Sequence, residues 1–187
     1  MSKVLDGSRL GSGAAVATLA RRAAQLRGYG LAMQLDLYGA FRKASRVPLG
    51  RTAVSVGYRA AAPYFLTAPM HLQEVEPGRA VATMRHVPWV RNHLGGVHAI
   101  ALCNLAEYAM GATAEATIPA ETHRWIPRGM TVDYLARAKG RMTATTTLEL
   151  PAGGLGDRQE LPVAISIRDD HGTEVCAAAI TIWVTAR

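Results

Sequence analysis

Residues 97–114 read VHAIALCNLAEYAMGATA, and the prediction of the fold begins from them. Apolar residues recur through it with neither strand alternation nor a polar stripe, so we predict one helix of about five turns. A helix that is apolar on every side is expected to be buried on every side. Its many alanines favour close approach by a sheet, so we place this helix at the centre of the domain.

Strand patterns lie on both sides of this helix. Two predicted strands before it are joined by Glu76-Pro77-Gly78-Arg79, where Pro followed by Gly suits a type II turn. The predicted strands cover residues 70–75, 79–87, 124–126 with 130–135, 141–150, 161–168 and 174–184. This order contains no βαβ alternation, so we predict an α+β fold with an antiparallel sheet of about six strands wrapped around the helix.

Residues 1–59 differ from the rest of the chain in composition and show no strand alternation. We predict that they form a helical extension to a main domain over 60–187. They are rich in Ala, Leu and Arg, with helix signals over 12–27 and 31–45 separated by Gly28 and Gly30. One face of the second helix should pack on the main domain. That face carries Leu31, Leu35, Tyr38 and Phe41.

The composition is that of a globular chain, with 49% apolar and 19% charged residues. The net charge of +7 suits a phosphate-bearing ligand, but the basic residues are scattered and no recognition helix is evident, so we expect no nucleic-acid binding. Near the N-terminus the apolar run precedes its arginines, whereas in a signal peptide the basic residues come first. No apolar run is long enough to span a bilayer, so we predict a cytoplasmic protein. Cys103 and Cys176 form no CxxC pair, so we expect neither a metal site nor a disulfide.

Glu107 is the first candidate for chemistry. A carboxylate in an otherwise apolar helix is costly unless it is paired or hydrogen-bonded, so a functional role competes with a Glu that reaches solvent or an arginine across an interface. His98 lies nine residues earlier, on the opposite helix face, and is therefore not an obvious proton partner. It is either a core histidine bonded to a carbonyl or a residue that orders the preceding loop, and it stays among the candidate catalytic residues.

Asn92, Gly95 and Gly96 precede the helix start, where free N–H groups and the helix dipole favour a carbonyl oxygen that becomes an oxyanion. Ile100 and Glu107 share a helix face but lie about 10 Å apart along the axis. One chain therefore cannot bring its helix start and its own Glu107 to one carbonyl carbon. This predicts a symmetric homodimer with two sites at its interface.

The segment Asn92-His93-Leu94-Gly95-Gly96-Val97-His98, followed by Leu105-Ala106-Glu107, resembles the core motif of hotdog-fold thioesterases of the phenylacetic-acid-degradation type. The resemblance covers about residues 60–186; the N-terminal helices are more similar to an uncharacterised branch. It implies a hotdog fold and hydrolysis of an acyl-coenzyme A, with Glu107 as nucleophile or general base. The N–H near Ala99 or Ile100 would be the oxyanion donor, and Asn92 would position water or substrate.

One departure from the family concerns its His-Gly-Gly, which is His98-Ala99-Ile100 here. The larger Ile100 side chain crowds the site, which predicts a narrower substrate range or a non-catalytic acyl-coenzyme A-binding protein. A second alternative is a 3-hydroxyacyl thioester dehydratase, because His93 and Glu107 have its spacing of fourteen. The surroundings typical of that family are missing.

Substrate contacts are expected from the loop before the helix and from basic side chains further along the chain. The loop residues His93, Gly95 and Gly96 would lie against the substrate, and the coenzyme A phosphates would meet basic side chains. The basic candidates are Arg137, Lys139 and Arg141. Coenzyme A enters as part of the substrate, so we expect no separate cofactor and no metal. Self-association as a homodimer or a dimer of dimers is expected.

Overall fold

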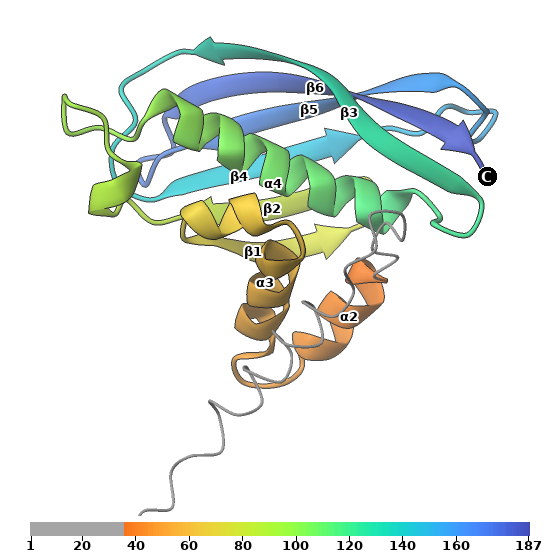
Figure 1. Cartoon of the computed structure of the whole chain (residues 1–187). Coiled ribbons are helices and arrows are strands. Elements are labelled where there is room, and N and C mark those ends of the chain that lie inside the picture. The colour runs from red at the N-terminus through yellow and green to blue at the C-terminus, as the bar shows by residue number, and fades with distance from the viewer. Residues whose placement is uncertain (1–35) are drawn as a thin grey trace, which may run out of the picture. The chain divides into compact units, whose positions relative to one another are not determined.

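A computed structural model describes residues 36–187 of the chain (Figure 1). Its helical elements are α2 (Leu37–Ala44), α3 (Gly50–Ala61), the 3-10 turns η1 (Pro63–Thr67) and η2 (Pro88–Val90), and α4 (Ala99–Thr117). Its strands are β1 (Met70–Glu76), β2 (Arg79–Met84), β3 (His123–Tyr134), β4 (Met142–Leu148), β5 (Gln159–Arg168) and β6 (Glu174–Ala186). No helix within these residues is long and apolar enough to cross a membrane.

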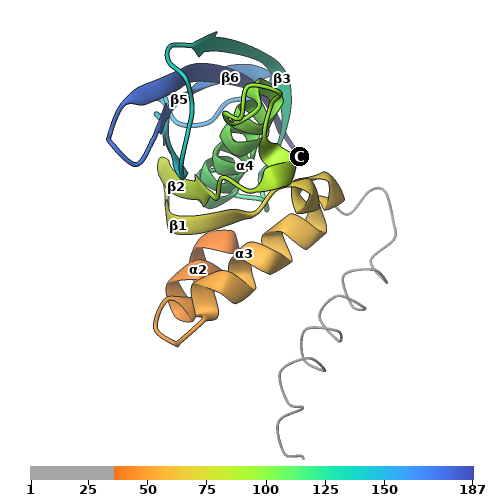
Figure 2. The same ribbon diagram turned by 90° about the vertical axis from the view of Figure 1, so that its left-hand side faces the viewer.

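The six strands form one antiparallel sheet in the order β1-β2-β4-β5-β6-β3. The sheet curls around α4, as the end-on view in Figure 2 shows. The predicted hotdog fold is therefore confirmed. The β1–β2 hairpin closes at the pair Glu76 and Arg79, and Gly78 has a φ of +80°, the left-handed conformation that a type II turn needs.

The strand alternation read from the sequence is also confirmed. Inward residues of β4 and β5 are buried against α4, whereas their neighbours face outward. The buried set is Met142, Ala144, Thr146 and Leu148 on β4, and Leu161, Val163, Ile165 and Ile167 on β5.

Strand β3 is one continuous edge strand with a bulge between Pro127 and Gly129. An edge position and a bulge are the places where a sheet tolerates proline. The inner face of β3 is only partly covered: Met130 pairs with the buried Ile180, yet its side chain is 37% exposed, and Tyr134 is 51% exposed.

Helix α4 is not buried on every side, so that expectation is wrong for its N-terminal half. The sheet covers one side of α4, and aromatic side chains of α3 and η1 pack on Tyr108 at another. A strip remains between β3, which contacts Cys103, and η1, which contacts Asn104. We call this strip, formed by Ile100, Cys103 and Glu107, the open strip of α4. Ile100 is 56% exposed, whereas Ala114, two helical turns after Glu107, is 0% exposed.

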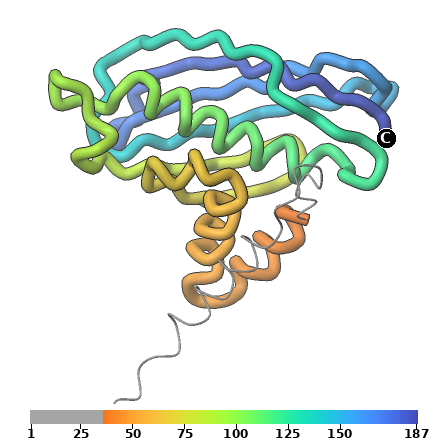
Figure 3. Tube along the Cα trace, in the orientation of Figure 1, coloured from red at the N-terminus to blue at the C-terminus, as the bar shows by residue number. Residues whose placement is uncertain are grey.

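The N-terminal arm holds two described helices. The predicted helix over 12–27, and Leu31 and Leu35 of the second, lie outside the described residues. Helix α2 packs on β1 and α4, with Leu37 and Phe41 buried. Phe41 belongs to the predicted face, whereas Tyr38 of that face is half-buried and Leu37 was not predicted. The sequence reading did not single out α3, which leads through η1 into β1 (Figure 3).

Candidate active site

Asn92 organises the loop that precedes α4. Its Oδ1 accepts from the N–H groups of Leu94 and Gly96, both at 3.0 Å, and its Nδ2 donates to the Val97 carbonyl at 3.4 Å. Its backbone N–H donates to the Gly96 carbonyl at 2.9 Å. Gly95 has a φ of +75° within this turn. The Asn92 side chain therefore holds the shape of the loop, and its expected contact with water or substrate stays a prediction.

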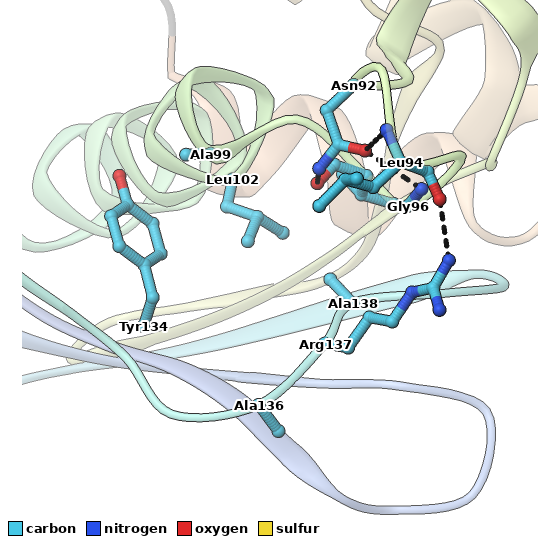
Figure 4. A pocket seen from close by; sticks show the side chains of 10 residues that line it. Asn92, Leu94, Gly96, Ala99, Leu102, Tyr134, Ala136, Arg137 and Ala138 are labelled. Atoms are coloured by element: carbon cyan, nitrogen blue, oxygen red, sulfur yellow. Dashed lines mark hydrogen bonds between the residues drawn. The ribbon is translucent and has the colours of Figure 1, made fainter.

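A second loop, residues 135–140, lies against the first (Figure 4). The Val97 N–H donates to the Ala138 carbonyl at 2.9 Å, and Arg137 Nη2 donates to the Leu94 carbonyl at 2.6 Å. A Cβ on Gly96 would lie 3.0 Å from the Ala138 oxygen, so glycine permits this close approach. The sequence predicted Gly96 as a substrate contact, and the structure adds this packing reason for it.

His86 also connects the two loops, and the sequence reading missed it. Its Nδ1 accepts from the Gly140 N–H at 3.2 Å. Burial, with the nearby charges of Arg91 and Lys139, lowers the pKa of His86 below its usual value. A neutral imidazole is the form that can accept at Nδ1. His86 belongs to no motif, so only the packing of the loops reveals it.

His98 caps the start of α4. Its Nδ1 accepts from the Ile100 N–H at 3.1 Å, which satisfies one of the free donors of the first turn. The Ala99 N–H has no hydrogen-bond partner in the described chain. Of the two N–H groups predicted as oxyanion donors, the Ala99 N–H is thus free and the Ile100 N–H is occupied by His98.

An apolar pocket of about 450 Å³ opens beside this helix start (Figure 4). The two loops, the first turns of α4 and the end of β3 line it. Its lining residues include Asn92, Leu94, Ala99, Leu102, Tyr134 and Arg137. A concave apolar pocket with a few polar groups at its rim is typical of a small-molecule site.

Tyr134 links the pocket to the open strip of α4. Its hydroxyl lies 3.1 Å from Cys103 Sγ, and this contact together with burial raises the pKa of Tyr134 to about 12. The phenol is therefore neutral at physiological pH and acts through hydrogen bonding and packing. The sequence reading did not select Tyr134, because nothing in its own strand distinguishes it from a core tyrosine.

Glu107 lies two helical turns beyond Ile100 on the open strip and does not line the pocket. The residue is half-buried, and its carboxylate has neither a hydrogen bond nor an ion pair within residues 36–187. An unpaired carboxylate on an otherwise apolar surface is available to a ligand or to a partner chain.

The other predicted substrate contacts are spread around the loops. His93 is exposed at the tip of the first loop, and Lys139 is exposed at the end of the second. Arg141 follows them, and its backbone N–H donates to Asp170 Oδ2 at 2.8 Å. Of the three basic candidates, only Arg137 lines the pocket.

Solved structures of other proteins share this fold. A structural genomics target, APC5556, is 36% identical, with a TM-score of 0.68 over 81% of this chain and 99% of that one. PA5026 of Pseudomonas aeruginosa, described as a protein of unknown function and probable thioesterase, is 20% identical, with a TM-score of 0.63 over 70% of this chain and 91% of that one. Thioesterase HI1161 of Haemophilus influenzae is 17% identical, with a TM-score of 0.57 over 66% and 82%.

No curated protein matches the chain in sequence. One family model does match, and its description is domain of unknown function, DUF4442. The match covers residues 50–184, so it includes α3, α4, strands β1 to β5 and all but the last two residues of β6. This hotdog-fold chain therefore belongs to the DUF4442 family.

Proposed function

We propose that this protein hydrolyses an acyl-coenzyme A thioester at a site shared by two copies of the chain. The observation that carries the proposal is the placement of two groups on one helix. The free Ala99 N–H lies at the start of α4 beside the apolar pocket, and the unpaired Glu107 carboxylate lies further along the same helix. The first suits a developing oxyanion and the second suits a general base.

The two groups belong to different copies because of their separation. Eight residues of helix separate Ala99 from Glu107, about 12 Å along the axis. One thioester carbonyl cannot contact both in a single chain. In a symmetric dimer with antiparallel α4 helices, Ala99 of each copy approaches Glu107 of the other, which gives two equivalent sites.

Exposed apolar surface around the open strip supports such a dimer. Ile100 of the open strip is 56% exposed, and Met130 and Tyr134 on the inner face of β3 are 37% and 51% exposed. Tyr134 contacts Cys103 of the strip. Strand β3 is also an unpaired edge of the sheet. Contiguous exposed apolar side chains and a free strand edge are typical of surfaces that bind another chain.

The proposed reaction needs no group beyond these residues and water. Ala99 N–H of one copy donates to the thioester oxygen, while Glu107 of the other removes a proton from a water molecule whose oxygen attacks the carbonyl carbon. The tetrahedral intermediate collapses with cleavage of the C–S bond, and the proton on Glu107 passes to the leaving thiolate. The products are a carboxylic acid and coenzyme A. Alternatively, Glu107 attacks the carbonyl itself and water hydrolyses the resulting anhydride.

Basic side chains near the pocket suit the coenzyme A phosphates. Arg137 lines the pocket and Lys139 is exposed one residue beyond Ala138. Neither forms an ion pair within residues 36–187, so both charges are available to a phosphate.

Thiol release from a panel of acyl-coenzyme A thioesters, from two to sixteen carbons with phenylacetyl and benzoyl included, tests the activity. Glu107→Gln and Glu107→Ala should each lower turnover by about two orders of magnitude or more. Glu121→Gln, an exposed glutamate outside the site, is the matched control and should keep turnover. Equal turnover in wild type and both Glu107 variants would refute the role of this carboxylate.

Mixed dimers test whether the site is shared. Ala99→Pro removes the donor N–H, and proline is favoured at the first position of a helix. The preceding His98 has φ −67° and ψ 139°, which proline accepts after it. Mixing equal amounts of the Ala99→Pro and Glu107→Gln chains should restore about a quarter of wild-type activity, because half the dimers carry one intact site. No recovery after demonstrated subunit exchange would place each site within one chain.

A non-catalytic acyl-coenzyme A-binding protein is the second candidate. It is favoured by the contact between His98 and Ile100, because that contact occupies one of the two N–H groups at the helix start. A binder would release no thiol from any thioester and would keep its affinity in Glu107→Gln.

A further inference from the structure

The open strip of α4 is closed one helical turn beyond Glu107. A methyl group at Gly111 would lie 2.5 Å from the Tyr58 hydroxyl and 3.7 Å from Trp125 Cη2. Tyr58 comes from α3 and Trp125 from β3, so two aromatic side chains from opposite sides of α4 meet over this glycine. Gly111 is buried, whereas Glu107 is not.

Tyr58 is held firmly on α3. Ser55, one turn earlier, accepts at its Oγ from the Leu72 N–H at 2.9 Å, which ties α3 to β1. The Tyr58 ring packs on Phe65 of η1 and Tyr108 of α4, with centroid distances of 6.2 and 5.2 Å. Burial, with the charges of Glu115 and Glu107 nearby, raises the pKa of Tyr58, so its hydroxyl stays protonated.

Trp125 is held from the other side. It pairs across β3 and β6 with the buried Val184 and packs against the core. Its indole N–H lies close enough to Glu115 to lower the pKa of that carboxyl, although burial is the larger effect and raises this pKa to about 7. Tyr58 is buried and Trp125 is half-buried against the core, so displacing either side chain disturbs its packing.

We propose that Tyr58 and Trp125 form a barrier that restricts the substrate to short acyl groups. This inference rests on the proposed thioesterase function. An acyl group attached to a carbonyl at Glu107, and extended along the open strip away from the start of α4, reaches Gly111 within about 6 Å. The two aromatic side chains stop it there, so a longer chain has no room on this face of the helix.

The barrier also assigns a role to part of the N-terminal arm. The hydroxyl of Tyr58 reaches α4 because residue 111 is a glycine, and α3 presents it there because Ser55 and Arg59 bind the β1 region. Arg59 Nη1 donates to the Ala68 carbonyl at 3.1 Å. Helix α3 thus acts in substrate selection in addition to covering the β1 edge of the sheet.

The test measures kcat/KM for straight-chain acyl-coenzyme A thioesters of two to sixteen carbons. Wild type should prefer chains of up to about six carbons, as the distance to Gly111 suggests. The measured quantity is kcat/KM for a ten-carbon chain divided by kcat/KM for a four-carbon chain. Trp125→Ala should raise this ratio by at least about tenfold, because it removes the side chain that obstructs the longer chain. Trp183→Ala, on the outer face of the same sheet, is the matched control and should leave the ratio unchanged.

Tyr58→Phe serves where Trp125→Ala does not fold. It keeps the ring and its packing and removes only the atom nearest Gly111, so the preferred chain should lengthen by one or two carbons. A wild type without chain-length preference, or a ratio that does not change in either variant, overturns the barrier.

A binding measurement tests the barrier separately if the proposed hydrolysis does not occur. If wild type releases no thiol, calorimetric titration with the same acyl-coenzyme A panel measures affinity instead. Tighter binding of short chains that shifts to long chains in Trp125→Ala would support the barrier in a non-catalytic protein. The same affinity for all lengths in wild type and variant would overturn it.

Discussion

The contact between Tyr58 and Gly111 yields a stability prediction that does not depend on any activity. Alanine in place of glycine in a helix interior is favourable by about 1 kcal/mol. At position 111, however, the added Cβ would lie 2.5 Å from the Tyr58 hydroxyl, a separation that real Cβ atoms essentially never show. Forcing an extra methyl into a packed site costs roughly 1–3 kcal/mol. Gly111→Ala should therefore leave the free energy of unfolding unchanged or lower it by up to about 2 kcal/mol.

The sign of the effect should reverse once the hydroxyl is gone. In Tyr58→Phe the remaining neighbours of the new methyl are Trp125 Cη2 at 3.7 Å and the ring carbon Cζ at 3.8 Å, both ordinary contacts. Gly111→Ala should then stabilise the protein by about 1 kcal/mol. The coupling energy between the two substitutions is the difference, about 1–3 kcal/mol.

Urea denaturation of the four proteins at one fixed protein concentration measures this cycle. Gly57→Ala is the control, because a Cβ there meets nothing within 4 Å and should stabilise α3 by up to about 1 kcal/mol. A coupling energy within error of zero would show that Tyr58 does not occupy the space over Gly111 in solution. That result would also remove the basis of the proposed barrier.

Three further predictions concern other residues. Burial raises the pKa of Glu115 to about 7, so the folded protein holds this proton more tightly than the unfolded chain, and its stability falls as pH rises from about 4.5 to 7. Glu115→Gln should therefore raise Tm more at pH 8 than at pH 5. An equal change in Tm at both pH values would contradict the shift. Asn92→Ala leaves the Leu94 and Gly96 N–H groups without their acceptor and should cost about 1–3 kcal/mol by urea denaturation, while Asn92→Asp, which keeps the acceptor, should cost less. Met130→Lys places a charge in the expected dimer surface and should give monomers in analytical ultracentrifugation; a monomeric wild type would argue against the shared site.

Local sequence patterns predicted most of the main domain. The alternation in β4 and β5, the turn at Gly78 and the apolar run that became α4 depend on residues close together in the chain. Such patterns express the period of a strand or a helix and the φ that a turn requires. These helices, strands and turns could therefore be predicted before any tertiary contact was known.

The helix start shows where prediction stopped. The sequence placed Asn92, His98 and the N–H groups of residues 99 and 100 together, and the structure places them there. It did not reveal that Asn92 bonds its own loop, or that His98 accepts from Ile100 and leaves the Ala99 N–H free. These hydrogen bonds depend on the side-chain rotamers of Asn92 and His98. The local sequence is compatible with several rotamers, so it does not predict which bonds form.

The open strip shows the same limit for a whole surface. An apolar helix was expected to be covered on all sides, because periodicity reports how apolar a face is and does not report which element covers it. The curl of the sheet and the position of η1 leave Ile100, Cys103 and Glu107 partly exposed. The candidate for catalysis was therefore named from the sequence, and its accessibility became known only from the fold.

The central helix, the succession of strands along the chain and the carboxylate within an apolar helix follow from the sequence alone, since each is encoded by neighbouring residues. That Tyr58 and Trp125 meet over Gly111 depends on tertiary packing. These three residues lie on α3, β3 and α4, and their contact exists because Ser55 ties α3 to β1 while β6 carries β3 around the helix. A contact made by three separate elements has no periodicity in the chain, so only their packing could place it.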